Sequence, residues 1–363
     1  MATIFFTGFP GFLGSRLLPR LLARSARNRA LCLVQPKFMG LAKRRLDEIV
    51  GQDPTLAGRI DLVEGDITKP GLGLESSGKL TREIEEAYHL AAVYALDVPR
   101  DVGMRVNVDG TRNVLDFLAT CSRFDRLHYV STCYVSGRYA GIFRERDLDK
   151  GQRFNNHYEE TKFLAEVDVQ ARMREGLSAT IYRPSIVVGE SHSGATQKFD
   201  GPYFLIRLML TMSKRLAILP VVGDPTAVRF NIVPSDFVVD AIAYLSGLKK
   251  SRGVVYQLAD PEPLTVDELL EEVARATERN LVRIPMPLGA ARRIVAHLPG
   301  PFRKLRIPAE SVDYFVHPTH YDTHNAQRDL TPKGITVPPF QSYLPNLVTF
   351  VREHPQIGAS AMV

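Results

Sequence analysis

A short apolar run near the N-terminus passes directly into a turn that has a glycine at every third position. Residues 2–7 form the run, and Gly8, Gly11 and Gly14 form the turn. Leucines at helical spacing follow within residues 12–23. A buried strand, a glycine turn and a helix make a βα unit whose helix N-terminus can hold a phosphate. The turn therefore predicts a dinucleotide-binding fold, although its G-x-x-G-x-x-G spacing differs from the usual G-x-G-x-x-G.

Strand and helix patterns alternate up to about residue 260. The alternation is typical of an α/β fold with a doubly wound parallel sheet, in which the carboxyl ends of the strands meet along one crevice. We expect strands at Ala2–Thr7, Ala30–Val34, Ile60–Val63, Ala87–Leu90, Leu127–Val130, Ala179–Val188 (broken by Pro184) and Val254–Leu258, and helices at Phe12–Ala23, Leu41–Val50, Met104–Thr120 and Asn156–Arg174.

The alternation weakens after about residue 190, which predicts a second, smaller unit. We expect a Rossmann domain in residues 1–190 plus 230–260, a C-terminal substrate lobe in 190–230 plus 260–345, and a tail in 346–363. Apolar residues from Tyr203 to Leu210 would suit an acyl chain at the entrance of this lobe.

Tyr158 and Lys162 stand four residues apart in the helix expected at 156–174, so both side chains lie on one face. An ammonium group favours the phenolate, and we expect Lys162 to lower the pKa of Tyr158 toward the working pH. A tuned phenol beside a phosphate-binding turn predicts proton transfer next to a hydride carrier.

The second expected strand bears on the choice of cofactor. An acid about 20 residues past the turn would accept the ribose hydroxyls of NAD. The chain has Gln35 there, and Lys37, Arg44 and Arg45 follow, which favours NADP(H) over NAD(H) without excluding NAD. Asp66, after the third strand, could cap the adenine amino group.

Composition limits the other functions. The net charge of +6 suits an anionic cofactor, a CoA-type substrate or a membrane surface, and it is too diffuse to predict nucleic-acid binding. Three cysteines without metal-ligand spacing, and no visible signal peptide, predict a reducing, cytoplasmic setting. We expect no metal site at His317, His320 and His324, because Pro318 breaks the helix that such spacing would need. The basic stretch 303–306 fits a solvated face or a membrane surface.

Five segments carry a resemblance to a known family. The chain resembles the extended short-chain dehydrogenase/reductases, and within them the thioester-reductase and fatty-acyl-CoA-reductase branch. The resemblance covers about residues 1–260 and rests on residues 7–18, 106–111, 129–137, 158–162 and 182–189.

The resemblance implies a seven-stranded parallel sheet and a set of site residues. Tyr158 would be the acid/base, Lys162 would hold the ribose, and Asn107, near the site, would be a further catalytic residue. Thr132 would hydrogen-bond the substrate oxygen, with Ser131 as a rival for that role. The residues expected to contact the cofactor are Gly8, Phe9, Pro10, Gly11, Phe12, Leu13, Gln35, Lys37, Asp66, Ile67, Ala91, Ala92, Val93, Val130, Tyr158, Lys162, Pro184, Ser185, Ile186 and Val187.

The function expected from these features is an NADP(H)-dependent oxidoreductase that reduces an acyl thioester, on CoA or a carrier, to an aldehyde or alcohol. A ketone, hydroxysteroid or cinnamoyl-type reductase stays open, as does a nucleotide-sugar epimerase or dehydratase. A non-catalytic NADP sensor is a further alternative. A small-molecule or acyl-thioester substrate is expected, and both a homodimer and peripheral membrane contact stay open.

Overall fold

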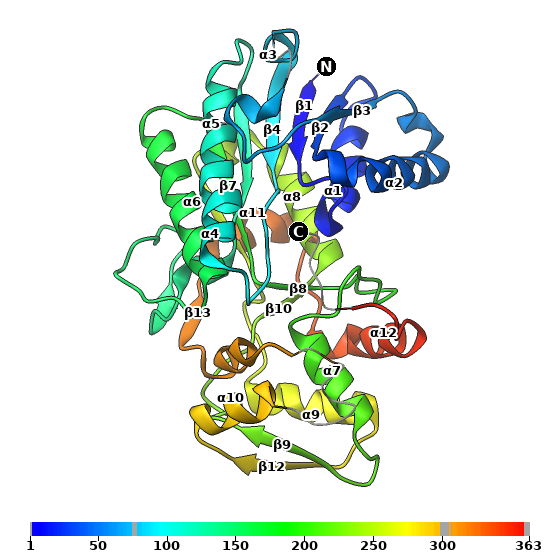
Figure 1. The fold of residues 1–363 in the computed structure, drawn as a ribbon, viewed down its shortest axis with the longest axis vertical. Coiled ribbons are helices and arrows are strands. Elements are labelled where there is room, and N and C mark those ends of the chain that lie inside the picture. The colour runs from blue at the N-terminus through cyan, green and yellow to red at the C-terminus, as the bar shows by residue number, and fades with distance from the viewer. Residues whose placement is uncertain (1, 75–77, 298–304, 306, 359–363) are drawn as a thin grey trace.

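The computed structural model describes residues 2–74, 78–297, 305 and 307–358. Its centre is a seven-stranded sheet, in which every pairing is parallel and the order is β11-β7-β5-β4-β1-β2-β3 (Figure 1). These strands are β1 (Thr3–Thr7), β2 (Arg29–Val34), β3 (Ile60–Glu64), β4 (Ile84–His89), β5 (Arg126–Val130), β7 (Ala179–Pro184) and β11 (Val255–Leu258). The predicted doubly wound α/β fold is confirmed.

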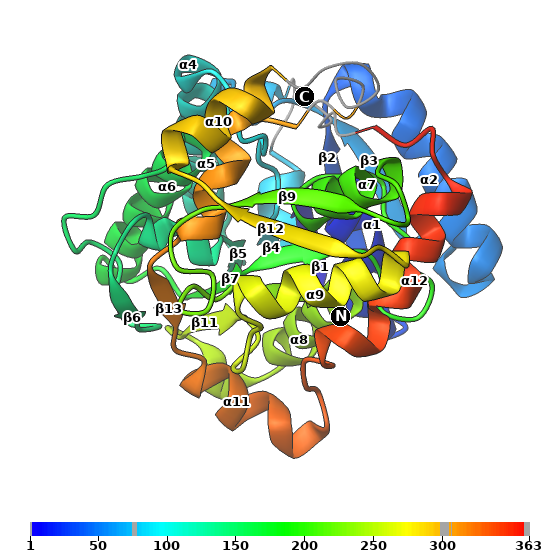
Figure 2. The same cartoon turned by 90° about the horizontal axis from the view of Figure 1, so that it is seen from below.

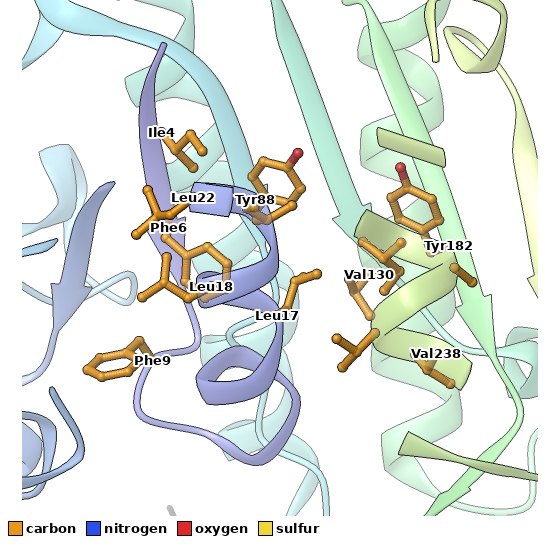
Figure 3. Close-up of a cluster of buried hydrophobic side chains, with 14 of the residues drawn as sticks. Ile4, Phe6, Phe9, Leu17, Leu18, Leu22, Tyr88, Val130, Tyr182 and Val238 are labelled. Carbon is orange, nitrogen blue, oxygen red and sulfur yellow. The ribbon is translucent and has the colours of Figure 1, made fainter. Parts of the chain in front are cut away.

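Helices cover both faces of this sheet. The alternation of β1 places Ile4 and Phe6 in one core cluster and Phe5 in another. Figure 3 shows Leu17, Leu18 and other residues of the first cluster between β1 and the helices on its side. That side carries α1 (Phe12–Ala23), α2 (Met39–Gln52) and α8 (Ser235–Ser246), and the other side carries α5 (Gly110–Ala119) and α6 (His157–Arg174).

The expected helix at 104–120 has an irregular start. The chain coils through α4 (Arg100–Gly103) and a π-helical turn at Met104–Asp109 before α5 begins. The short helix α3 (Leu80–Glu83) precedes β4. A π-helical turn widens the coil and is frequent near functional sites. Here it contains Asn107.

The lobe lies below the carboxyl ends of the strands in Figure 1 and has its own apolar core. Figure 2, seen from below, shows that a two-stranded parallel ribbon lies across its outer side. The ribbon is β9 (Ala217–Val221) with β12 (Leu281–Pro285). The lobe helices are α7 (Pro202–Thr211), α9 (Val266–Thr277), α10 (Leu288–Ala296) and α12 (Phe340–Glu353).

The break expected at Pro184 is present, because β7 ends there and β8 (Ile186–Val188) leaves the sheet to pair with β10 (Ile232–Pro234). Two other details differ from the prediction. Helix α11 (His324–Leu330) packs on the sheet domain and not in the lobe, and a pair between β6 (Gly141–Phe143) and β13 (Thr319–Tyr321) precedes it. The tail expected from residue 346 is wrong up to residue 353, because α12 buries Leu347 and Val351 in the lobe core.

Candidate active site

One cavity of about 1190 Å³ begins at the glycine turn, passes the tops of the central strands and ends in the lobe. Every residue expected to contact the cofactor lines it, and so do Thr132, Tyr158 and Lys162. Asn107 is not in its wall. The topology therefore brings nearly all of the predicted site residues to one crevice, as parallel strands with shared carboxyl ends require.

The glycine turn is packed so closely that side chains would not fit. Gly8 has φ +94°, a left-handed conformation that favours glycine. A Cβ atom at Gly11 or Gly14 would stand 2.7 or 2.4 Å from the Gly8 carbonyl oxygen. Helix α1 begins directly after Gly11 with no side-chain cap, so its first N–H groups are open to an anion. The turn fits the pyrophosphate of a dinucleotide.

The residues around the expected nucleoside are polar and partly fixed. The Gln35 side-chain amide donates to Asp66 Oδ1 at 3.0 Å, and Thr68 donates to the same oxygen through its N–H and its hydroxyl. Although burial opposes the effect, these hydrogen bonds hold the pKa of Asp66 below its usual value. Lys37 and Arg45 line this end of the cavity, whereas Arg44 does not.

Tyr158 lies near the N-terminus of α6, where Asn156 caps the helix by accepting from the Glu159 N–H at 3.0 Å. Burial raises the pKa of Tyr158, and a hydrogen bond with Thr132 is the largest effect in the opposite direction. The expectation that Lys162 brings this pKa down is therefore wrong. Tyr158 is a neutral phenol at neutral pH and can donate a proton.

Lys162 is hydrogen-bonded to the end of strand β5. Its Nζ donates to the Tyr129 hydroxyl at 3.1 Å and to the Val130 carbonyl at 2.9 Å. Burial lowers the pKa of Lys162 to about 8, and the negative charge of Glu166 opposes this shift. The side chain is fixed at the end of β5, where it lines the cavity between the two ends.

Thr132 and Ser131 have different partners, which separates the two rivals. Ser131 donates to Glu166 Oε2 at 2.5 Å in a buried network, so its hydroxyl proton is already used. Thr132 donates to the Pro184 carbonyl at a longer 3.3 Å and accepts from the Tyr134 N–H. Its contact with Tyr158 makes Thr132 the better placed hydroxyl for a substrate oxygen.

Asn107 has a different role from the predicted one. It is 1% exposed, and its side-chain amide bonds the backbone N–H and C=O of Val93 at 2.9 and 3.1 Å. The same amide donates to the Thr161 hydroxyl at 3.0 Å. Asn107 therefore fixes the loop after β4 against α6. It is a positioning residue behind the cavity wall, and its expected catalytic role is revised.

His89 supports the same loop through hydrogen bonds to Thr7 and Thr111. Its ring nitrogens lie 2.7 Å from the Thr7 hydroxyl oxygen and 3.0 Å from that of Thr111. Burial, followed by the charge of Lys162, lowers the pKa of His89 to about 3, so the ring is neutral. Thr7 in turn accepts from the Ala91 N–H at 3.2 Å. The loop that contains Ala91 and Val93 is thus held at both ends.

Three residues beside Tyr158 were not found from the sequence. Asp200 Oδ2 accepts from the Tyr94 hydroxyl at 2.5 Å and from Lys198 Nζ at 2.7 Å. The Lys198 ammonium stands 3.7 Å from the centre of the Tyr94 ring, and the rings of Tyr94 and Tyr158 are 6.0 Å apart. This cluster joins the β4 loop to the segment before α7. Only Tyr94, close after the expected strand 87–90, had a positional signal.

The lobe end of the cavity is apolar. From residue 201 onward, no charged side chain occurs among the described residues that line it. Helix α7 contributes Phe204, Leu205 and Leu208, which lie within the apolar segment expected at 203–210. Where the two ends meet, the buried Ser185 Oγ lines the cavity without a hydrogen-bond partner. This atom fits a polar group of a bound molecule, such as the expected nicotinamide carboxamide.

Two other expectations concern metals and membranes. Within the described ranges, no group of three His, Cys, Asp or Glu residues could hold a metal ion. His317 bonds the Tyr321 hydroxyl at 2.9 Å, and burial lowers its pKa to about 3. No described helix combines the length and hydropathy needed to cross a membrane. Of the basic stretch 303–306, all but Leu305 lies outside the described residues.

Comparison with known proteins identifies the family. A family model described as "Male sterility protein" matches residues 6–242. The chain belongs to this family. This family comprises extended short-chain dehydrogenase/reductases of the male-sterility and thioester-reductase type. The expected resemblance is confirmed.

Relatives of this male sterility family member include much longer proteins. It is 31% identical over 70% of its length to the non-canonical nonribosomal peptide synthetase cpsA of Aspergillus campestris, and 27% identical over 75% to the glycine betaine reductase ATRR of Emericella nidulans. The matches span only 25% and 22% of those proteins. The terminal R domain of the myxalamid PKS-NRPS pathway is 28% identical, with a TM-score of 0.80 over 99% of this chain and 93% of that chain.

Proposed function

We propose that the protein reduces an acyl thioester to an aldehyde with NADPH. The observation that carries the proposal is the continuous cavity that joins a dinucleotide turn, the Thr132–Tyr158 pair and an apolar end. Likeness to a terminal R domain and to a peptide synthetase supports a thioester substrate, on CoA or on a carrier. A second reduction, of the aldehyde to the alcohol at the same site, is part of the proposal.

The chain's own residues supply the proton and the alignment. When bound, the nicotinamide supplies a hydride for the carbonyl carbon. Thr132 would hydrogen-bond the carbonyl oxygen, and the neutral phenol of Tyr158 would give that oxygen its proton. The hemithioacetal hydroxyl then returns its proton to the Tyr158 phenolate as the C–S bond breaks, the departing thiolate takes a proton from solvent, and the aldehyde forms. Lys162 would hold the ribose from the end of β5, and Ser185 would bond the carboxamide.

A preference for NADP(H) is part of the proposal. Gln35 replaces the acid that would accept the ribose hydroxyls, and its amide is directed to Asp66. Lys37 and Arg45 line the same end of the cavity and can neutralise a 2′-phosphate. These contacts support NADP(H) but leave NAD(H) as the alternative to be measured.

The main rival is an epimerase or dehydratase for nucleotide sugars. A UDP-glucuronic acid 4-epimerase from Bacillus cereus shares the fold, with 18% identity and a TM-score of 0.66. A sugar diphosphate carries two negative charges that require cations or N–H donors in the substrate end. Lys198 lines the cavity beside Tyr158 but is paired with Asp200, and from residue 201 onward the described lining offers no Lys or Arg. This favours an aliphatic acyl group.

The test is NADPH and NADH oxidation with butyryl-CoA, palmitoyl-CoA, the matching aldehydes, and simple ketones. Turnover of an acyl-CoA with release of free thiol supports the proposal. Turnover of aldehydes or ketones without thioesters overturns it in favour of a carbonyl reductase. Tightly bound NAD with no net oxidation of added cofactor overturns it in favour of an epimerase.

A further inference from the structure

Several exposed large apolar side chains gather at one end of the lobe. Seven such side chains are exposed among the described residues, and all but Tyr94 and Ile142 lie on β9, β12, α10 or the residue before β9. Figure 2 shows the two strands lying across this end of the molecule. We name this surface the lobe-tip face, and it consists of Leu216, Ile218, Val282, Ile284 and Ile294, which are 44–50% exposed.

The strand register explains why these side chains share one face. Ile218 pairs with Val282, so their side chains project to the same side of the ribbon. The alternate residues of β9 point inward, where Leu219 and Val221 are buried and line the cavity. Strand β9 therefore separates an apolar cavity from an apolar outer surface.

The segments that carry this face contain basic but no acidic residues, although Glu278 and Glu271 from neighbouring segments pair with Lys214 and Arg283. Residues 208–222 and 279–297 contain no Asp or Glu, and their basic residues include Arg215 and Arg293. Both are exposed, and neither forms an ion pair with another described residue. By contrast, Lys214 and Arg292 nearby are paired with Glu278 and Asp313. Two unpaired guanidinium groups beside an aliphatic patch are complementary to phosphate groups above hydrocarbon.

We infer that the lobe-tip face binds an anionic lipid surface. Its aliphatic side chains would enter the acyl boundary, while Arg215 and Arg293 would meet the headgroup phosphates. A protein partner is less favoured, because the centres of protein interfaces are enriched in aromatic residues and the five apolar side chains of this face are all aliphatic. This inference goes beyond the proposed reduction, since it concerns where the enzyme meets its surroundings.

The experiment is co-sedimentation of the full chain with vesicles of phosphatidylcholine alone, or of phosphatidylcholine mixed with phosphatidylglycerol. The test variant carries Ile218→Glu and Ile284→Glu. The control is Ile142→Glu, because Ile142 is an even more exposed isoleucine on the short strand β6, away from the lobe-tip face. A second variant, Arg215→Gln with Arg293→Gln, removes the charges alone. A thermal melt and turnover of a water-soluble substrate establish that each variant is folded.

The expected result is binding to phosphatidylglycerol vesicles that weakens with salt. It should fall by ~10-fold or more in the double glutamate variant and by a smaller factor in the arginine variant, and it should persist in Ile142→Glu. Absence of binding by the wild type overturns the inference, as does binding that the glutamate variant retains. A wild-type dimer that dissociates in the glutamate variant, measured by light scattering, also overturns it. Vesicle binding does not depend on turnover, so failure of the proposed function would be recognised separately.

Discussion

The two ends of the cavity are built by different physical means. At the cofactor end, Gly8, Asn107 and His89 occupy positions where another residue would clash or leave a buried group unpaired. At the lobe end, the wall is set by apolar packing, in which residues of similar volume can replace one another at small cost. The comparison teaches that the chemistry of this fold depends on residue identity, whereas the choice of substrate depends on shape.

The strongest test of the identity-dependent end is Tyr158→Phe. We expect turnover to fall by ~10²–10⁴-fold, because the variant removes the proton donor and little else. NADPH binding, followed by its fluorescence, should be unchanged. Tyr244→Phe, a partly buried tyrosine on α8, is the matched control. Wild-type turnover in Tyr158→Phe would remove the phenol from the mechanism.

The shape-dependent end is tested by Ala291→Phe. Ala291 on α10 is fully buried, lines the cavity and packs with Val222 and Val312 in the lobe. A ring there should lower kcat/KM for a palmitoyl thioester by about 10- to 200-fold, the range for a displaced methylene group, and leave a butyryl thioester unaffected. Ala290→Phe, on the exposed side of the same helix, is the control. Equal losses for both thioesters would show that the lobe end does not hold the acyl chain.

Cofactor choice sharpens the comparison further. Replacing both Lys37 and Arg45 by Ala should raise the KM for NADPH by ~10-fold or more, because even one charged contact to a phosphate contributes about 1.5–3 kcal/mol. The KM for NADH should stay close to that of the wild type. Arg44→Ala is the control, since Arg44 lies on the same helix outside the cavity. A parallel loss with both cofactors would argue against a 2′-phosphate site.

The smallest expected effect is on stability. Burial raises the pKa of Glu145 to about 7, although three backbone N–H groups favour its charged form. The folded state then binds this proton more tightly than the unfolded state, so stability falls as the pH rises from the ordinary carboxyl range to about 7. Glu145→Gln should reduce that fall by on the order of 1 kcal/mol.

Thermal unfolding at pH ~5.5 and ~8 measures this slope. Some slope should remain in Glu145→Gln, because burial also raises the pKa of Glu159 to about 7. Glu48→Gln on the surface is the control. An unchanged slope in Glu145→Gln would assign the pH dependence to other groups.

The sequence predicted the end that depends on identity much better than the end that depends on shape. A local pattern contains all the information for the strand–turn–helix at Gly8 and for the shared face of Tyr158 and Lys162. By contrast, β9 and β12 contain Pro220 and Pro285, which are unusual within strands, and they pair across a long stretch of chain, so neither has a clear local signal. The pKa of Tyr158 could not be predicted either, because it depends on burial by distant segments.

Within the site, too, local features could be predicted from the sequence, whereas contacts between distant segments could not. Asn107 was found from its helix, but its partners Val93 and Thr161 come from other elements, so its positioning role needed the fold. The Tyr94–Asp200–Lys198 cluster joins two loops that have no periodic pattern. Interactions between irregular segments are invisible to spacing rules, even when they stand beside the reacting groups.

The hydrogen bonds that Glu145 accepts from distant backbone N–H groups affect the order in which the chain can fold during synthesis. The buried Glu145 carboxylate accepts hydrogen bonds from the backbone N–H groups of Asn325 and Ala326 at the start of α11. The ribosome synthesises that helix about 180 residues after Glu145. Until α11 has been synthesised, Glu145 lacks those two hydrogen-bond donors and part of its burial. The sheet domain therefore cannot complete its packing until α11 has been synthesised. A chain truncated ahead of residue 324 should fold incompletely and be bound by chaperones or degraded by proteases.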